Sequence, residues 1–254
     1  MKGLIYRRFY LTRKNIILSA AVLVGVIIFE VLICLSFKYG NLARVADPDD
    51  VKATVGTFCL IIVTMITLSG FASEHGLLAS DIKANYDMYS YTIPISEEKK
   101  ALVHIGFMFT GAVLGLVVAV LNCVLVASLG VMSMGDVKIY AVLSLVIAVM
   151  FSLLECIKAP LIIRLRKENT ATAAAFGVTV AVYIVGMMAF SGYYRNKYAL
   201  VEDGTMTEVQ LEKELLASLK RLGLTVGWVL PILLVGMYVL SYLFMVKFLK
   251  RRRG

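Results

Sequence analysis

Ionisable side chains are rare within the long apolar stretches of this chain, and three of them have types and positions that could carry chemistry. Glu30 is a lone carboxylate in the first stretch, and Glu155 and Lys158 lie three residues apart near the end of the fourth. A carboxylate surrounded by hydrocarbon is costly, so Glu30 is expected to face the interior of a helix bundle or to be protonated. The alternative is that Glu30 lies near a membrane interface and reaches water. Glu155 and Lys158 share one helix face, which favours a structural ion pair.

Motifs for several classes of enzyme and metal site are absent from the sequence. There is no GxxxxGK[ST] phosphate loop, no HExxH and no GxSxG, and the two histidines, His75 and His104, are far apart. The four cysteines lie in apolar stretches without CxxC spacing, so they are interpreted as small buried hydrophobes. We therefore expect no catalytic residue, no metal site and no cofactor bound by this chain. Cys34 and Cys59 both lie toward the same predicted surface, and whether they pair stays open.

The composition places the chain in a membrane. Apolar residues make up 60% and charged residues 17% of the sequence, and the mean hydropathy is +0.84, whereas about a quarter of the residues of a soluble domain are charged. The net charge of +9 comes from short basic runs between the apolar stretches, not from one basic module. This pattern favours a role in membrane orientation and argues against a nucleic-acid partner.

Six apolar stretches are long enough to cross a bilayer, because a helix needs about 20 residues to span the hydrocarbon core. The sequence contains no alternation of period two, and a spanning segment must satisfy its own backbone hydrogen bonds, so all six are predicted to be helices. The first is too long for a signal peptide and contains Glu30, so it is expected to stay in the mature protein. The predicted fold is an all-α polytopic membrane protein, a single domain over residues 1–254. Its spans are 16–37, 53–73, 101–130, 139–157, 171–192 and 223–246.

The distribution of Lys and Arg predicts the orientation of these helices. One side, formed by the N-terminus, the loops 74–100 and 158–170 and the tail from Lys247, carries 17 basic residues, and the other side carries 9. Because short basic loops resist translocation, the richer side is expected to be cytoplasmic. Both chain ends are therefore predicted to lie in the cytoplasm.

Two amphipathic segments are expected to flank the spans. Residues 1–15 mix apolar and basic side chains, which is typical of a helix lying in the headgroup layer on anionic lipid, although a basic flank that only fixes the topology is an equal alternative. In the extracellular segment 193–222, Thr205 and Glu208 have capping-box spacing, and leucines follow at helical intervals. This pattern predicts an amphipathic extracellular helix before the sixth span.

Small residues and a proline mark places where the helices are expected to pack closely or bend. Gly111 and Gly115 form GxxxG in the third span, which lets helices approach one another within the chain or between two copies. Pro231 removes a backbone donor inside the sixth span, so a kink is expected there, and this kink is a candidate hinge.

The loop 74–100 is the most informative segment. Pro94 ends an extended piece, Ser96 is a natural N-cap, and Glu97 and Glu98 suit the first turn of the next helix. The loop is thus predicted to protrude from the bundle while joined rigidly to two membrane helices. Such an element is suited to receive force from a soluble partner.

At this loop the sequence becomes similar to a known family. Phe71 and Glu74 at the end of the second span, the aromatic run from Tyr86 to Tyr91, and the phrase from Thr92 to Ser96 resemble the ATP-binding-cassette type-2 (ABC-2) permeases. They are similar in particular to small bacterial members that include exporters of phenol-soluble modulins and peptide antibiotics. The opening MKGLIYRRFYLTRKN, the length and the six-helix layout are similar too.

The resemblance implies a bacterial plasma-membrane exporter whose ATP and Mg²⁺ are bound by a separate cytoplasmic ATPase. It also implies an interfacial elbow at residues 1–15 and pairing with a second copy or a paralogue. The loop would be the coupling element docking on the ATPase, with Glu74, Tyr91, Pro94, Ile95, Ser96 and Glu97 as the coupling residues. The chain departs from the family at Glu97 and Glu98, where a basic residue is common.

The sparse charge within the spans favours an amphipathic or hydrophobic substrate, such as a peptide, a drug or a lipid-like molecule, and makes Glu30 the candidate for the translocation path. One alternative is an ion-coupled secondary transporter, which would show two related halves that this sequence lacks. The other is a membrane-embedded enzyme or a non-transporting sensor or immunity partner.

Overall fold

The computed structural model describes residues 2–39, 61–67, 75–84, 95–130, 137–202 and 208–253, and all the regular secondary structure in these ranges is α-helix. The prediction of an all-α fold is confirmed for this part of the chain. Residues 61–67 form a short helical segment. The other helices are α1 (Lys2–Tyr39), α3 (His75–Lys83), α5 (Glu97–Ser128), α6 (Val137–Leu165), α7 (Glu168–Glu202) and α8 (Glu208–Arg253).

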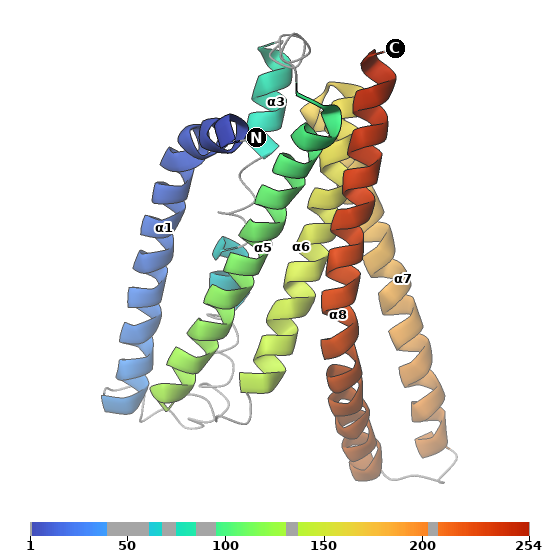
Figure 1. The fold of residues 1–254 in the computed structure, drawn as a ribbon. Coiled ribbons are helices and arrows are strands. Elements are labelled where there is room, and N and C mark those ends of the chain that lie inside the picture. The colour runs from blue at the N-terminus through green and yellow to red at the C-terminus, as the bar shows by residue number, and fades with distance from the viewer. Residues whose placement is uncertain are drawn as a thin grey trace.

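Five of these helices are long and apolar enough to cross a membrane, so the chain is a multi-pass helical membrane protein. The candidate spans lie within α1, α5, α6, α7 and α8. Most of the predicted second span, residues 53–73, falls outside the described residues, so the number of six stays a prediction. α1 and α5 run in the same direction, so Tyr39 and Glu97 lie at opposite ends of the bundle (Figure 1).

One end of the bundle gathers the segments that carry most of the basic residues. The N-terminus, α3, the start of α5, the junction of α6 with α7 and the C-terminus all lie there (Figure 1). We call this end the basic end and the opposite one the far end. The side of the membrane that each end faces stays a prediction.

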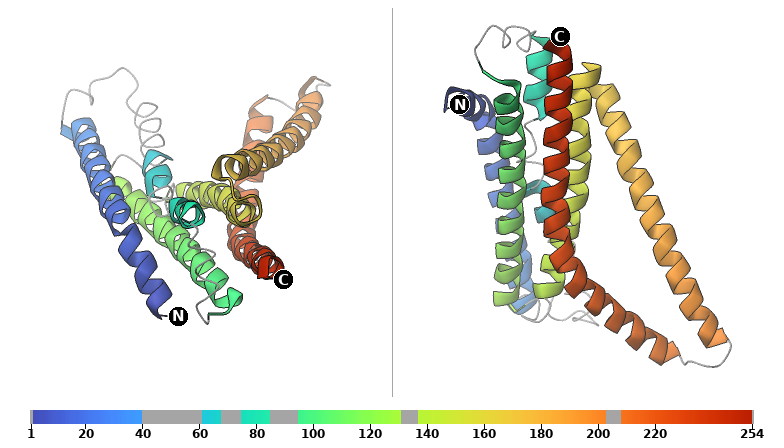
Figure 2. Two further views of the ribbon diagram at one scale, coloured as in Figure 1. Left: turned by 90° about the horizontal axis from the view of Figure 1, so that it is seen from above. Right: turned by 45° about the vertical axis from the view of Figure 1, so that its right-hand side comes forward.

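The N-terminal part of α1 lies across the basic end, and the rest of α1 runs along the bundle (Figures 1 and 2). The stretch predicted as an interfacial helix, residues 1–15, is helical from Lys2 and continues without a break into the first span. The Thr12 hydroxyl donates to the carbonyl of Arg8 at 2.9 Å and to that of Phe9 at 3.4 Å. This kind of back-bonding often bends helices, which gives a local reason for the change of direction.

Three helices are longer than the apolar stretches from which they were predicted. α6 continues to Leu165 and α7 to Glu202, and α8 begins at Glu208, so the predicted amphipathic helix and the sixth span are one helix. Residues 208–222 are rich in Glu, Leu, Lys and Ala, which favour helix whether or not they lie in lipid, so nothing interrupts α8 where the apolar stretch begins. α8 bends along its course, and Pro231 lies inside it (Figure 2). A hinge at Pro231 stays a prediction.

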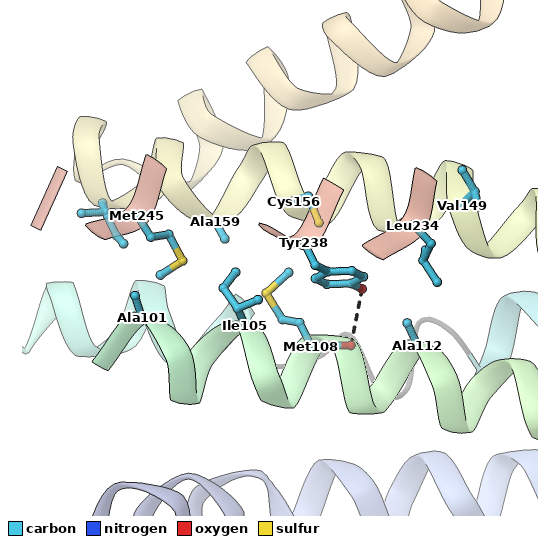
Figure 3. Close-up of a cluster of buried hydrophobic side chains, with 11 residues drawn as sticks. Ala101, Ile105, Met108, Ala112, Val149, Cys156, Ala159, Leu234, Tyr238 and Met245 are labelled. Atoms are coloured by element: carbon cyan, nitrogen blue, oxygen red, sulfur yellow. Dashed lines mark hydrogen bonds between the residues drawn. The ribbon is translucent and has the colours of Figure 1, made fainter. Parts of the chain in front are cut away.

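The main hydrophobic core joins α5, α6 and α8 (Figure 3). Ala101 and Ala159 are completely buried, and such small residues let the helix backbones approach closely. Gly111 and Gly115 of the GxxxG pattern are buried in α5 as well. The other core side chains are Ile105, Met108, Ala112, Val149, Cys156, Ile163, Leu234, Tyr238 and Met245.

Polar contacts within this core are directional. The Tyr238 hydroxyl donates to Ser152 Oγ at 3.2 Å and lies 3.4 Å from the carbonyl oxygen of Met108, and the Ser241 hydroxyl donates to the carbonyl of Cys156 at 2.8 Å. These contacts set the rotation of α8 against α5 and α6. α1 lies at the edge of this core and packs on α5, and α7 diverges from the bundle toward the far end (Figure 2).

Candidate functional site

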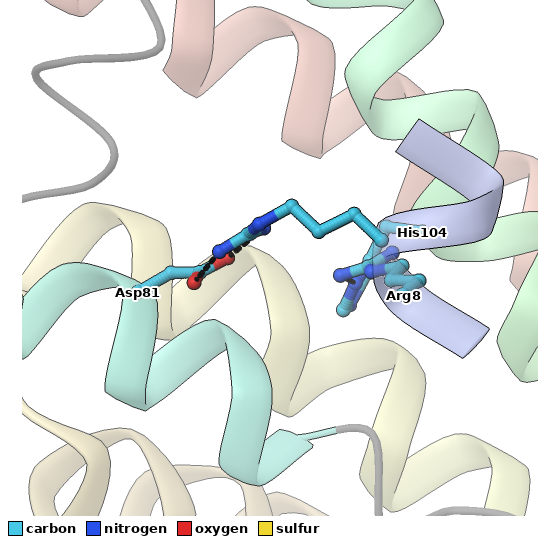
Figure 4. A network of polar contacts seen from close by, with 4 residues as sticks. Arg8, Asp81 and His104 are labelled. Carbon is cyan, nitrogen blue, oxygen red and sulfur yellow. Dashed lines mark hydrogen bonds and ion pairs between the residues drawn. The ribbon is translucent and has the colours of Figure 1, made fainter. Parts of the chain in front are cut away.

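A two-point ion pair joins α1 to α3 at the basic end. Arg7 Nη1 donates to Asp81 Oδ2 at 3.0 Å, and Arg7 Nη2 donates to Asp81 Oδ1 at 2.5 Å (Figure 4). A guanidinium that faces a carboxylate with two parallel hydrogen bonds fixes orientation as well as distance. The pair therefore holds the helix of the loop 74–100 against the N-terminal part of α1.

The neighbouring arginine joins α1 to α5. Arg8 is buried, and its guanidinium contacts Nδ1 of His104, which is only 2% exposed (Figure 4). A guanidinium can only donate, so Nδ1 of His104 accepts, and this neutral imidazole carries its proton on Nε2. Two successive residues of α1 thus contact two different helices, α3 and α5.

The first turn of α5 is built as the sequence predicts. Ser96 has extended backbone angles (φ −65°, ψ 146°), and its side chain accepts from the Lys99 backbone N–H at 3.4 Å. Glu97 and Glu98 follow in the first turn. The predicted N-cap is confirmed, so the chain enters α5 through a fixed turn.

Glu97 differs from the expectation for a docking residue. Its side chain is 4% exposed, and Lys100 Nζ donates to its Oε1 at 3.1 Å. A carboxylate buried in this way supports the start of α5 and presents little surface to another protein. The adjacent Glu98 is exposed instead.

Glu98 joins α5 to the C-terminal part of α8. Lys250 Nζ lies 2.6 Å from Glu98 Oε1, and both side chains are more than half exposed. Water screens such a pair, so it adds little stability, and its value is to place the end of α8 beside the start of α5.

The structure describes only some of the predicted coupling residues. Glu74, Tyr91 and Pro94 lie outside the described residues, whereas Ile95, Ser96 and Glu97 lie together at the start of α5. Sequence reasoning missed the contacts between helices at this end: the ion pair of Arg7 with Asp81, the contact of Arg8 with His104 and the pairing of Lys250 with Glu98. Opposite charges at predicted helix ends on the same side of the membrane were the available signal, but they do not specify which residues pair.

A second polar group lies in the other half of the bundle. Glu30 of α1 is 1% exposed, and Asn122 of α5, which is 3% exposed, donates its side-chain N–H to Glu30 Oε1 at 3.2 Å. This burial argues against the alternative in which Glu30 reaches water at the membrane interface. The contact joins α1 to α5 a second time, far from Arg8 and His104.

Hydroxyl and thiol groups from neighbouring helices accompany this pair. Thr64 Oγ1 and Ser144 Oγ are 3.4 Å apart, and the Cys123 thiol is hydrogen-bonded with Ser144. Cys34 packs against Cys123 in the same buried cluster, and both are free thiols. Cys59 lies outside the described residues, so pairing with Cys34 stays open.

The remaining candidates lie apart from both groups. Glu155 in α6 is buried, and Lys158 interacts with it electrostatically, while the contact ion pair stays a prediction. Pro231 is exposed in α8. Among the residues that the structure describes, no three His, Cys, Asp or Glu side chains gather as metal ligands.

The arrangement as a whole is a bundle whose loop-side helices are tied together by charge, with one buried carboxylate deeper inside. α1 and α5 carry both features: the polar contacts that connect the helices at the basic end, and the buried pair of Glu30 and Asn122. Comparison of the chain with protein-family models, with curated proteins and with solved structures finds no match.

Proposed function

We propose that this chain is the membrane-spanning permease subunit of an ATP-binding-cassette exporter. It would move an amphipathic or hydrophobic substrate, such as a peptide, a drug or a lipid-like molecule, out of a bacterial cell. A separate cytoplasmic ATPase would bind ATP and Mg²⁺, because this sequence has no phosphate-binding loop of its own. The multi-pass helical fold and the resemblance of the loop 74–100 to ABC-2 permeases support the proposal.

The observation that carries the proposal is the set of ion pairs at the basic end. The described parts of the loop 74–100 are α3 and the start of α5, and Arg7 ties α3 to α1 through Asp81. Lys250 ties the start of α5 to α8 through Glu98. A soluble motor that pushed on this loop would therefore act on three of the five candidate spans, namely α1, α5 and α8.

The way α1 is packed suggests which movement follows. α1 packs on α5, and the buried side chains among its described residues are Arg8, Thr12, Glu30 and Cys34. The core of α5, α6 and α8 is held by close apolar packing, so it moves as a unit. In this proposal ATP binding tilts that unit against α1. The contact between α1 and α5 then opens alternately to the inside and to the outside of the membrane.

A dimer is part of the proposal, because one bundle of this size offers little room for a path at its centre. Large apolar side chains are exposed along α1, including Ile17, Leu18, Phe29 and Leu32. In a membrane this face contacts lipid or a second subunit. A second copy or a paralogous chain, each with its ATPase, would complete the exporter.

Two experiments separate this function from its rivals. If the chain is an exporter subunit, a Walker-type ATPase should co-purify with the solubilised chain. ATP should also drive uptake of an amphipathic dye into inside-out membrane vesicles. Transport that follows an ion gradient and ignores ATP would instead identify a secondary transporter. The absence of both transport and a bound ATPase would identify a non-transporting sensor or immunity partner.

A further inference from the structure

One face of α8 changes from apolar to basic near the end of the helix. Leu233, Leu240, Phe244, Lys247 and Arg251 follow one another at intervals of three, four or seven residues, so they lie on the same face. All five are exposed, and the three apolar side chains are 44–56% exposed. From Leu240 to Arg251 this face is about 16 Å long, which is half the thickness of a hydrocarbon core. The face therefore has the length of one leaflet of a bilayer.

The end of α6 adds a third cation to the basic part of this face. Arg164 is an exposed residue in the last turn of α6, and its guanidinium carbon lies 5.6 Å from the centre of the Phe248 ring. Phe248 follows Lys247 directly and lies one turn before Arg251. A guanidinium over an aromatic ring is held by its face and keeps its N–H groups at its edge for other acceptors. The ring thus holds Arg164 beside the two cations of α8.

These three cations have no acidic partner in the part of the chain that the structure describes. Arg164, Lys247 and Arg251 form no ion pair there, whereas the neighbouring Lys250 pairs with Glu98. Like charges four residues apart on a helix repel each other, and Lys247 and Arg251 have this spacing. An anion bound between the ends of α6 and α8 would remove this repulsion.

The apolar part of the same face indicates which kind of anion fits. A free phosphate, or an acidic surface of another protein, would contact the cations and would make no use of Leu240 and Phe244. An anionic phospholipid carries its phosphate at the membrane surface and its acyl chains along the apolar residues below it. Basic residues directly beside the end of a transmembrane helix attract such lipids. The order of side chains along α8 matches the order of groups in a phospholipid.

We propose that Arg164, Lys247 and Arg251 bind the phosphate of an anionic phospholipid whose acyl chains lie along Leu240 and Phe244. The guanidinium and ammonium groups donate charge-assisted hydrogen bonds to the phosphate oxygens. One lipid then contacts the ends of both α6 and α8 and holds them at the level of the headgroups. The inference requires a membrane-spanning chain and no ATPase, so it goes beyond the exporter function and can fail independently of it.

A titration of the wild-type chain is the first test. The full chain is purified in a neutral detergent, and bound lipid is counted by native mass spectrometry. Phosphatidylglycerol should bind at least tenfold more tightly than phosphatidylcholine with the same acyl chains. Glycerol 3-phosphate at the same concentration should not displace the lipid. Equal affinity for the two lipids would overturn the proposal, and displacement by glycerol 3-phosphate would assign the cations to a free phosphate instead.

A pair of double variants separates a defined site from the overall charge. Arg164→Gln with Arg251→Gln should weaken binding of phosphatidylglycerol at least tenfold and leave that of phosphatidylcholine unchanged. Lys83→Gln with Lys99→Gln is the matched control, because it removes two exposed cations from the same end of the bundle. The control should bind phosphatidylglycerol as the wild type does. Equal affinity of the two double variants would overturn the proposal.

The role of Phe248 is tested by keeping or removing its ring. Phe248→Leu removes the aromatic face under Arg164 and should weaken binding of phosphatidylglycerol several-fold, whereas Phe248→Tyr keeps the ring and should bind as the wild type does. Equal binding by these two variants would contradict the placement of Arg164 in the site. Loss of a co-purifying ATPase in the Arg164–Arg251 variant, with lipid binding unchanged, would assign the cations to a protein partner and overturn the lipid site.

Discussion

Arg7 and Asp81 lie 74 residues apart in the chain and meet through two parallel hydrogen bonds, so the N-terminal part of α1 is held to the helix of the loop 74–100. The next residue, Arg8, contacts α5 through Nδ1 of His104. These contacts converge on one turn of α1, and in the proposed exporter this turn would pass movement of the loop to the first span. The account makes the following predictions about it.

Breaking the Arg7–Asp81 pair should uncouple the loop from α1. Asp81→Asn removes the charge and keeps the shape, and because the pair is partly exposed the loss of stability should be about 1 kcal/mol or less. We expect ATP hydrolysis by the partner to continue while ATP-driven transport falls several-fold. Arg7→Asp combined with Asp81→Arg restores an ion pair and should recover most of the transport. Wild-type transport by each single variant, Arg7→Asp and Asp81→Arg, would show that the pair transmits nothing.

His104 is expected to matter for stability more than for charge. His104→Ala removes the acceptor that faces the buried Arg8 guanidinium, which should cost about 2–3 kcal/mol, since hydrogen bonds to charged groups are the strong ones. His104→Gln supplies an amide oxygen and should recover part of that loss. The melting temperature of the chain in detergent measures both variants. If the two variants melt together, the hydrogen bond to Arg8 is not what His104 contributes.

Ser96 caps α5, and its loss should loosen the start of that helix. Ser96→Ala removes the side chain that accepts from the Lys99 N–H and should cost about 1 kcal/mol. Ser96→Asp keeps an acceptor at the cap and should be close to wild type. Hydrogen exchange of the amides of residues 97–100 reports the effect directly, and unchanged protection in Ser96→Ala would contradict the capping role.

Pro94 and Ile95, which precede the cap residue Ser96, are predicted to transmit movement of the ATPase to α5. Replacing Pro94 and Ile95 with Gly makes the chain before α5 more flexible, because Gly has more freedom than any other residue. The variant should insert normally and bind the ATPase, but transport per ATP hydrolysed should drop strongly. Replacing exposed Ala84, at the end of α3, with Gly is the control, and it should change this ratio little. Wild-type coupling in the Pro94–Ile95 variant would remove this segment from the mechanism.

The sequence predicted the parts of the fold that depend on local chemistry. The apolar stretches indicated the spans because crossing hydrocarbon needs a fixed length, and Ser96 indicated the start of α5 because a cap is a local hydrogen bond. The helices α1, α6, α7 and α8 run beyond the predicted spans, because the spans were placed where polarity changes. A helix continues as long as its residues favour helix, and Glu208 onward do so.

The partners of the site residues could not be predicted from one sequence. Glu30 was recognised as unusual because a carboxylate in an apolar stretch is costly, but Asn122, 92 residues away, gave no sign that it would lie beside it. In the same way the sequence marks Arg7 and Arg8 only as basic residues near the N-terminus. Which acid or imidazole each one meets depends on how the helices pack, and that depends on side-chain shapes across the whole core.

The orientation of the bundle is the claim on which the account depends most directly, and two exposed lysines at opposite ends of it provide the test. Lys99 is in the first turn of α5 at the basic end, and Lys138 is at the start of α6 at the far end. Each is replaced by cysteine in a chain without other cysteines and labelled with a membrane-impermeant maleimide. In intact cells the cysteine at position 138 should react, and the cysteine at position 99 should react only after the membrane is permeabilised. Labelling at position 99 in intact cells would place the loop outside the cell, beyond the reach of any cytoplasmic ATPase, and would contradict the account.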